Sequence, residues 1–159
     1  MFRCQNRTYE FKIVTFREHR HEDKIAKIST VYYDEIAVAK DFEKCFNDIM
    51  MGDTEKIELL QKLFGYSLTG DTSLEKFVII WGESTRNGKS TLLESIAYLM
   101  GNADGYALST EPEVFAEMKR DSRQASGEIA RLAGCRFLES SDAKKNMRLD
   151  SAWLTKLRA

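Results

Sequence analysis

An apolar run, a polar loop bounded by glycines and a helical pattern, in that order, constrain this chain more than any other feature. Residues 77–81 (Phe-Val-Ile-Ile-Trp) are five consecutive apolar residues, which predicts a buried strand of a parallel sheet. A polar loop from Gly82 to Gly88 follows, and residues 89–100 have helical periodicity up to Gly101. A strand, a loop of this kind, Gly-Lys-Ser and a helix predict a phosphate-binding loop.

The loop contains the residue types that binding of a triphosphate requires. Its two glycines allow backbone N–H groups to turn inward, and the following helix N-terminus adds partial positive charge. Lys89 is expected to contact the β- and γ-phosphates of ATP, and Ser90 to ligate the Mg²⁺ that the nucleotide carries. Five residues separate the glycines instead of the usual four, so either the loop is one residue longer or Glu83 takes the place of the first glycine. The candidate nucleotide-binding residues are Gly82, Glu83, Ser84, Thr85, Arg86, Asn87, Gly88, Lys89, Ser90 and Thr91.

Hydrolysis of a bound nucleotide also requires an acidic residue at the end of a neighbouring strand, near the magnesium ion. Residues 135–142 (Cys-Arg-Phe-Leu-Glu-Ser-Ser-Asp) predict a short strand that ends in polar and acidic residues. Glu139 and Asp142 both fit the role. The alternative is a strand end that is acidic without any catalytic purpose.

Several stretches resemble the phage and plasmid primase–helicase proteins of helicase superfamily three, a branch of the AAA+ ATPases. The resemblance implies that Lys89 and Ser90 are the ATP and Mg²⁺ residues. The second acidic motif of that family usually ends in Ser-Glu-Pro, which matches Ser141-Asp142-Ala143 with Asp for Glu and Ala for Pro. The match favours Asp142 over Glu139 as the acidic residue and as the second Mg²⁺ residue. The stretches that carry the resemblance are residues 64–71, 81–91, 130–137 and 148–157.

The resemblance implies an ATP-driven DNA helicase that acts as a homo-oligomeric ring on single-stranded DNA, in the cytoplasm of a bacterial host. In the family the segment matching 154–157 continues into a Gly-Gly-Asp motif, a polar sensor residue and an arginine finger. This chain ends at Ala159. We therefore expect an α/β fold with an incomplete P-loop (AAA+-like) parallel sheet core, and weak or absent ATP hydrolysis by the chain alone.

Two other functions fit the same motif. A non-catalytic, truncated subunit could bind or inhibit a full-length helicase ring. A small P-loop kinase is the other possibility, but no arginine-rich segment suited to a lid follows Asp142.

The residues before the loop predict a β-hairpin region (1–37) and a small helical region (38–72), ahead of the partial P-loop core (73–159). Alternating apolar residues in 9–13 and the apolar run 25–33 predict two strands joined by a polar connection at 17–24. Apolar stripes at helical spacing predict two helices, one before Gly52 and one that stops at Gly65.

Composition adds limits on the kind of protein. Of 159 residues, 43% are hydrophobic and 31% are charged, as in globular proteins, and the three cysteines are too few and too far apart for a disulfide framework or a zinc ribbon. The N-terminus has no apolar signal-peptide core, so we expect a soluble intracellular protein. The net charge is −1, but residues 119–148 contain eight basic and four acidic residues. Lys144, Lys145 and Arg148 in this stretch either contact DNA or, as is more usual for such clusters, form a solvated surface.

Overall fold

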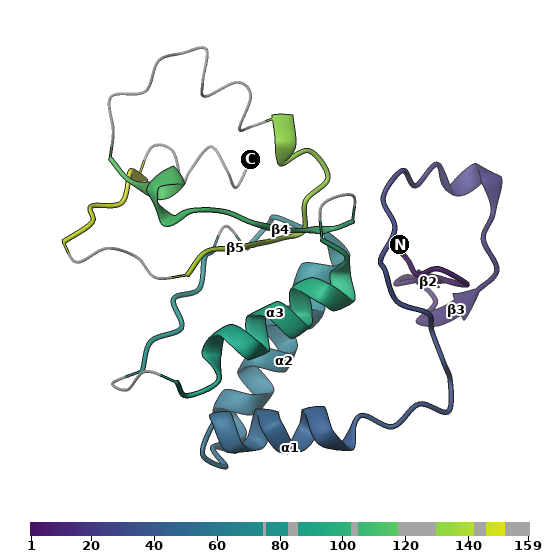
Figure 1. Ribbon diagram of the computed structural model, residues 1–159. Coiled ribbons are helices and arrows are strands. Elements are labelled where there is room, and N and C mark those ends of the chain that lie inside the picture. The colour runs from purple at the N-terminus through teal and green to yellow at the C-terminus, as the bar shows by residue number, and fades with distance from the viewer. Residues whose placement is uncertain (75, 83–85, 103–104, 118–129, 142–145, 152–159) are drawn as a thin grey trace.

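Helix α3 (Lys89–Met100) lies between a two-stranded parallel sheet and a pair of helices, and an N-terminal antiparallel sheet lies beyond its C-terminal end (Figure 1). The computed structural model describes residues 1–74, 76–82, 86–102, 105–117, 130–141 and 146–151. This part of the chain is mixed α/β, as expected. The parallel strands are β4 (Ala107–Ser109) and β5 (Phe137–Glu139), the paired helices are α1 (Lys40–Ile49) and α2 (Thr54–Thr69), and the N-terminal strands are β1 (Phe2–Arg3), β2 (Thr8–Glu10) and β3 (Thr15–Arg17). Two 3-10 helices, η1 (His21–Asp23) and η2 (Pro112–Phe115), complete the elements described.

Helix α3 contributes to two hydrophobic clusters, and this makes it the central element of the fold. Leu92 packs with residues of α1 and α2, and Met100 packs with residues of β1 and of the start of β4. Met100 is 0% exposed, so it contributes its full transfer free energy, roughly 1.5–3 kcal/mol. The helical cluster comprises Phe46, Leu60 and Leu92, and the sheet cluster comprises Phe2, Cys4, Ile96, Ala97, Met100, Tyr106 and Ala107.

The last turn of α3 is held by the N-terminal segment. The hydroxyl of Ser29 donates a hydrogen bond to the carbonyl of Leu99, and that of Thr30 donates one to the carbonyl of Tyr98 at 2.8 Å. The last four carbonyls of a helix have no partner within it, so these hydroxyls satisfy two of them. Because Ser29 is 0% exposed, this attachment lies inside the packed structure.

The N-terminal sheet differs from the predicted hairpin. Strand β2 confirms part of the predicted first strand, but it pairs with β1 and β3 rather than with residues 25–33. Residues 25–33 form no strand; they run beside β1, with Ser29 N–H bonded to the Arg3 carbonyl at 2.8 Å and Gln5 N–H bonded to the Val31 carbonyl at 2.9 Å.

Ion pairing explains why the polar residues after position 14 fold into β3 and η1 instead of forming a solvated connection. Arg17 lies 2.7 Å from Glu10 and 2.6 Å from Asp23, and all three side chains are at most 20% exposed. The hydrogen bonds from Arg17 lower the pKa of Asp23. A network of partly buried charges therefore replaces the apolar strand pairing that the sequence pattern suggested.

Residues 77–81, predicted to be a buried strand, are exposed and belong to no strand of the described structure. Phe77, Ile79 and Trp81 are 54%, 71% and 76% exposed, whereas Ile80 packs against the helical cluster. A strand exists only if a neighbouring strand shares its backbone hydrogen bonds, and residues 77–81 pair with none of the described strands. The prediction of a buried strand is wrong for this structure, and a complete P-loop core is not formed by the described residues.

The helices follow their predicted apolar stripes, with one difference at Gly65. Helix α2 continues through Gly65 to Thr69 and ends at Gly70, which has φ +72. An internal glycine costs a helix about 1 kcal/mol without ending it, whereas the left-handed conformation at Gly70 does end it. In the part of the chain that is described, no helix has the length and apolar character needed to cross a membrane.

Candidate functional site

The predicted phosphate-binding loop leads directly into α3, which begins at Lys89 as expected. Gly88 precedes the helix with φ +79, a conformation that favours glycine. A Cβ at Gly88 would lie 2.7 Å from Cγ1 of Ile49, the last residue of α1. Backbone angle and packing therefore both require glycine at this position.

Inside the loop, two side chains meet beside Gly82. Lys89 Nζ donates a hydrogen bond to Asn87 Oδ1 at 2.5 Å. A Cβ at Gly82 would lie 2.5 Å from Asn87 Nδ2 and 3.2 Å from Lys89 Nζ. The chain thus folds back so that the ammonium group of Lys89 lies next to the backbone where the loop begins. Glu83, Ser84 and Thr85 fall outside the described residues.

The first turn of α3 presents positive charge next to this loop. The first backbone N–H groups of a helix have no acceptor within it, and Gly88, the N-cap residue of α3, has no side chain that could cap them. The first turn contains no acidic residue, and Ser90 and Thr91 are exposed. The helix terminus and the charge of Lys89 together favour an anion at this place.

Glu139, one of the two predicted acidic residues, is the last residue of β5, so the predicted strand and its acidic end are confirmed. Burial raises the pKa of Glu139, the negative charge of Glu94 raises it further, and a hydrogen bond from Ser109 on the paired strand opposes the shift. Ser90 and Glu94 are four residues apart and share one face of α3. Glu139 therefore lies near the face of α3 that also contains Ser90.

Asp142, the other predicted acidic residue and the second predicted Mg²⁺ residue, lies outside the described residues, as do Lys144 and Lys145. Within the described ranges, no group of three or more His, Cys, Asp or Glu side chains is arranged to hold a metal ion. The Mg²⁺ that Ser90 is expected to ligate would take most of its ligands from the phosphates of the nucleotide and from water.

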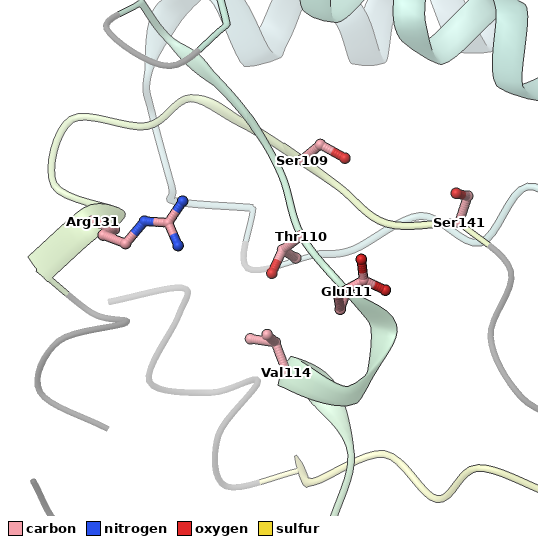
Figure 2. Close-up of a pocket in the computed structure, with 6 residues that line it drawn as sticks. All are labelled: Ser109, Thr110, Glu111, Val114, Arg131 and Ser141. Carbon is pink, nitrogen blue, oxygen red and sulfur yellow. The ribbon is translucent and has the colours of Figure 1, made fainter. Parts of the chain in front are cut away.

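A polar hollow of about 340 Å³ lies at the carboxyl ends of β4 and β5 (Figure 2). The guanidinium of Arg131 and the side chain of Thr110 extend toward each other across it, and Ser141 follows β5 on the far side. Ligands of open α/β sheets bind beyond the carboxyl ends of the strands, so this position suits a binding site. The hollow is lined by Ser109, Thr110, Glu111, Val114, Arg131 and Ser141.

Three features of this region escaped the sequence analysis. Glu94 and Ser109 influence the pKa of Glu139, and the side chain of Asn87 accepts a hydrogen bond from the ammonium group of Lys89. The spacing of Ser90 and Glu94 in the sequence could have predicted that they share one face of the helix. The sequence could not predict the role of Ser109, because that role depends on the register that pairs Ser109 with Glu139.

Comparison with known proteins identifies no relative of this chain: no protein-family model, no curated protein and no solved structure matches it.

Proposed function

We propose that this chain binds ATP with Mg²⁺ through residues 82–91 and is the ATP-binding part of a phage or prophage DNA replication helicase. The observation that carries the proposal is the place of Lys89. Its ammonium group lies beside the backbone of Gly82, at the N-terminus of a helix whose N-cap residue is Gly88. A fixed cation next to the backbone N–H groups of a helix N-terminus is the arrangement that binds phosphate.

The chemistry follows from these groups. Phosphate oxygens would replace the amide oxygen of Asn87 as the acceptor for Lys89, because a phosphate carries negative charge that attracts the ammonium group and a neutral amide does not. The hydroxyl of Ser90 would complete the ligands of the nucleotide's Mg²⁺. Glu139, with its raised pKa, would accept a proton from the water that attacks the γ-phosphate.

The helicase assignment rests on the resemblance of residues 64–71, 81–91, 130–137 and 148–157 to superfamily three. In that family, ATP hydrolysis between subunits of a ring moves single-stranded DNA and separates the duplex. Work of this kind takes place in the cytoplasm of the bacterial host.

Nucleotide binding is tested by thermal unfolding with and without Mg²⁺-ATP. At a nucleotide concentration 100 times Kd, linkage stabilises the protein by about 2.7 kcal/mol, or about 5–10 °C in Tm for a chain of this size. Lys89→Ala should abolish the shift, whereas Lys44→Ala, at an exposed position on α1, should preserve it. An unchanged Tm at millimolar ATP would exclude the proposal.

A second function, a non-catalytic subunit that binds a full-length helicase, is supported by the exposed residues 77–81. Extended chain with exposed apolar side chains can add a strand to the sheet of another protein. Size-exclusion chromatography with a full-length superfamily-three helicase discriminates the two. Co-elution together with suppression of that helicase's ATPase favours this second function, and separate elution contradicts it.

A further inference from the structure

A second hollow, of about 480 Å³, lies at the amino-terminal ends of β4 and β5, opposite to the ends where the hollow of Figure 2 lies. Four segments far apart in the sequence form it: residues 24–27, the end of α2, the residue before β4 and the loop before β5. Its principal lining residues are Lys24, Lys27, Gly70, Tyr106, Gly134 and Arg136.

The described lining of the hollow is cationic. Lys24, Lys27 and Arg136 line it, and none of the described lining residues carries a carboxylate. Asp23, which precedes Lys24, is paired with Arg17 at 2.6 Å. None of the ion pairs between described residues includes any of the three lining cations.

Two of the three cations are held in place by specific contacts. The guanidinium carbon of Arg136 lies 4.3 Å from the centroid of the Tyr106 ring, and its Nη1 donates to the carbonyl of Leu68 at 2.6 Å. Lys27 Nζ donates to the carbonyl of Gly105 at 2.9 Å. A site whose charges are fixed in advance loses less entropy when a ligand binds.

Glycine provides the space for these two side chains. A Cβ at Gly70 would lie 3.0 Å from Nε of Arg136, and a Cβ at Gly134 would lie 2.9 Å from Cε of Lys27. Larger residues at either position would displace the cation next to it. Burial also holds the pKa of Arg136 below its usual value, as expected for a half-buried cation without a carboxylate nearby.

We propose that this hollow binds a phosphate group, either that of a single-stranded nucleic acid or that of a small phosphorylated ligand. The planar guanidinium of Arg136 matches phosphate geometry, and Lys24 and Lys27 add two further positive charges to the lining. A volume of about 480 Å³ suits a ligand of nucleotide size. The site is separate from residues 82–91, so the proposal does not depend on ATP binding there.

The test uses the full chain with Lys89→Ala, which removes phosphate binding by the loop before α3. Inorganic phosphate is titrated by calorimetry, and a fluorescent ten-nucleotide oligo-dT is titrated by anisotropy over a range of salt concentrations. Lys24→Gln with Lys27→Gln should weaken binding of the occupying ligand at least tenfold. If that ligand is the oligonucleotide, the slope of log affinity against log salt should fall by about 2, one for each lysine.

The matched control is Lys12→Gln with Lys44→Gln, which removes the same charge from exposed positions outside the hollow. Selective loss of phosphate and oligonucleotide binding identifies a nucleic-acid site, and selective loss of phosphate binding alone identifies a small-ligand site. Absence of binding by both probes, or equal weakening in the control, would overturn the proposal. Lys24 is exposed, whereas Lys27 is half-buried and bonds to the carbonyl of Gly105, so the Tm of the double variant verifies its fold, and Lys24→Gln alone should weaken binding in the same direction.

Discussion

The two segments that flank the loop 82–88 differ in how they are stabilised. Residues 89–100 form a regular helix whose Leu92 and Met100 are 2% and 0% exposed. Residues 77–81, with a more apolar sequence, are mostly exposed and form no strand within the described structure. Figure 1 shows α3 between its packing partners and the segment before the loop at the periphery.

The difference arises from where each segment finds its hydrogen bonds. A helix satisfies its backbone within itself and needs neighbours only for its apolar face. A strand needs a neighbouring strand for its backbone hydrogen bonds, and residues 77–81 pair with none of the described strands. Apolar sequence alone is therefore sufficient to place α3 but not to place a strand at 77–81.

The largest expected effect is a difference in stability between variants of the two segments that flank the loop. Met100→Ala should destabilise the protein by about 2–5 kcal/mol, because it leaves a cavity in the sheet cluster. Ile79→Ala, at a position 71% exposed, should change stability by less than about 0.5 kcal/mol. Chemical denaturation measures both. Similar losses of stability in the two variants would mean that residues 77–81 are buried in solution, and would contradict the difference between the two segments.

A smaller effect is expected at the junction between the loop and α3. Gly88→Ala should cost about 1–2 kcal/mol for the left-handed backbone, and more because its Cβ would meet Ile49 at 2.7 Å. Gly52→Ala is the matched control, since Gly52 has φ +72 and no atom within 4 Å of its Cβ position. The loss of stability in Gly88→Ala beyond that in Gly52→Ala measures the effect of the contact with α1. Equal stability losses would show that α1 does not support the loop.

The smallest effect concerns the pH dependence of the acidic end of β5. Burial and Glu94 raise the pKa of Glu139, so stability is highest while Glu139 is protonated, and falls as pH rises from its ordinary pKa, about 4.3, through the raised value. Glu139→Gln should remove this fall, and Glu94→Gln should reduce it, because burial is the larger cause. Unfolding free energies measured from pH 4 to 8 test both variants. Parallel profiles for the wild type and Glu139→Gln would contradict this account.

Local patterns were enough to predict the helices and one strand. The apolar stripes of α1 and α2, the start of α3 at Lys89 and the strand β5 all appear where the sequence places them. In each case a pattern within about 15 residues decides the structure. The end of α2 was misplaced because Gly65 and Gly70 are equivalent in composition, and only the backbone angle at Gly70 distinguishes them.

Long-range partners account for what the sequence analysis missed. The prediction that residues 25–33 pair with β2 was wrong. Strand β3 is held beside β2 by the ion pairs of Arg17 with Glu10 and Asp23, and a pattern of apolar residues does not predict ion pairs. The position of Lys89 in the candidate site was predictable from Gly-Lys-Ser. Its bond to Asn87 and the pairing of Ser109 with Glu139 depend on loop and sheet geometry, which spacing does not encode.

The hydroxyl contacts at the last turn of α3 have a consequence for the order of folding. Ser29 and Leu99 are 70 residues apart, so their bond forms only after the chain has closed a long loop. The turn next to the loop 82–88 packs against α1 and α2, which are closer in sequence and can be in place earlier, whereas the turn at Met100 must wait for the N-terminus. Contacts of such separation slow folding, and we expect a refolding intermediate, if one accumulates, to have α3 frayed at the end remote from Lys89.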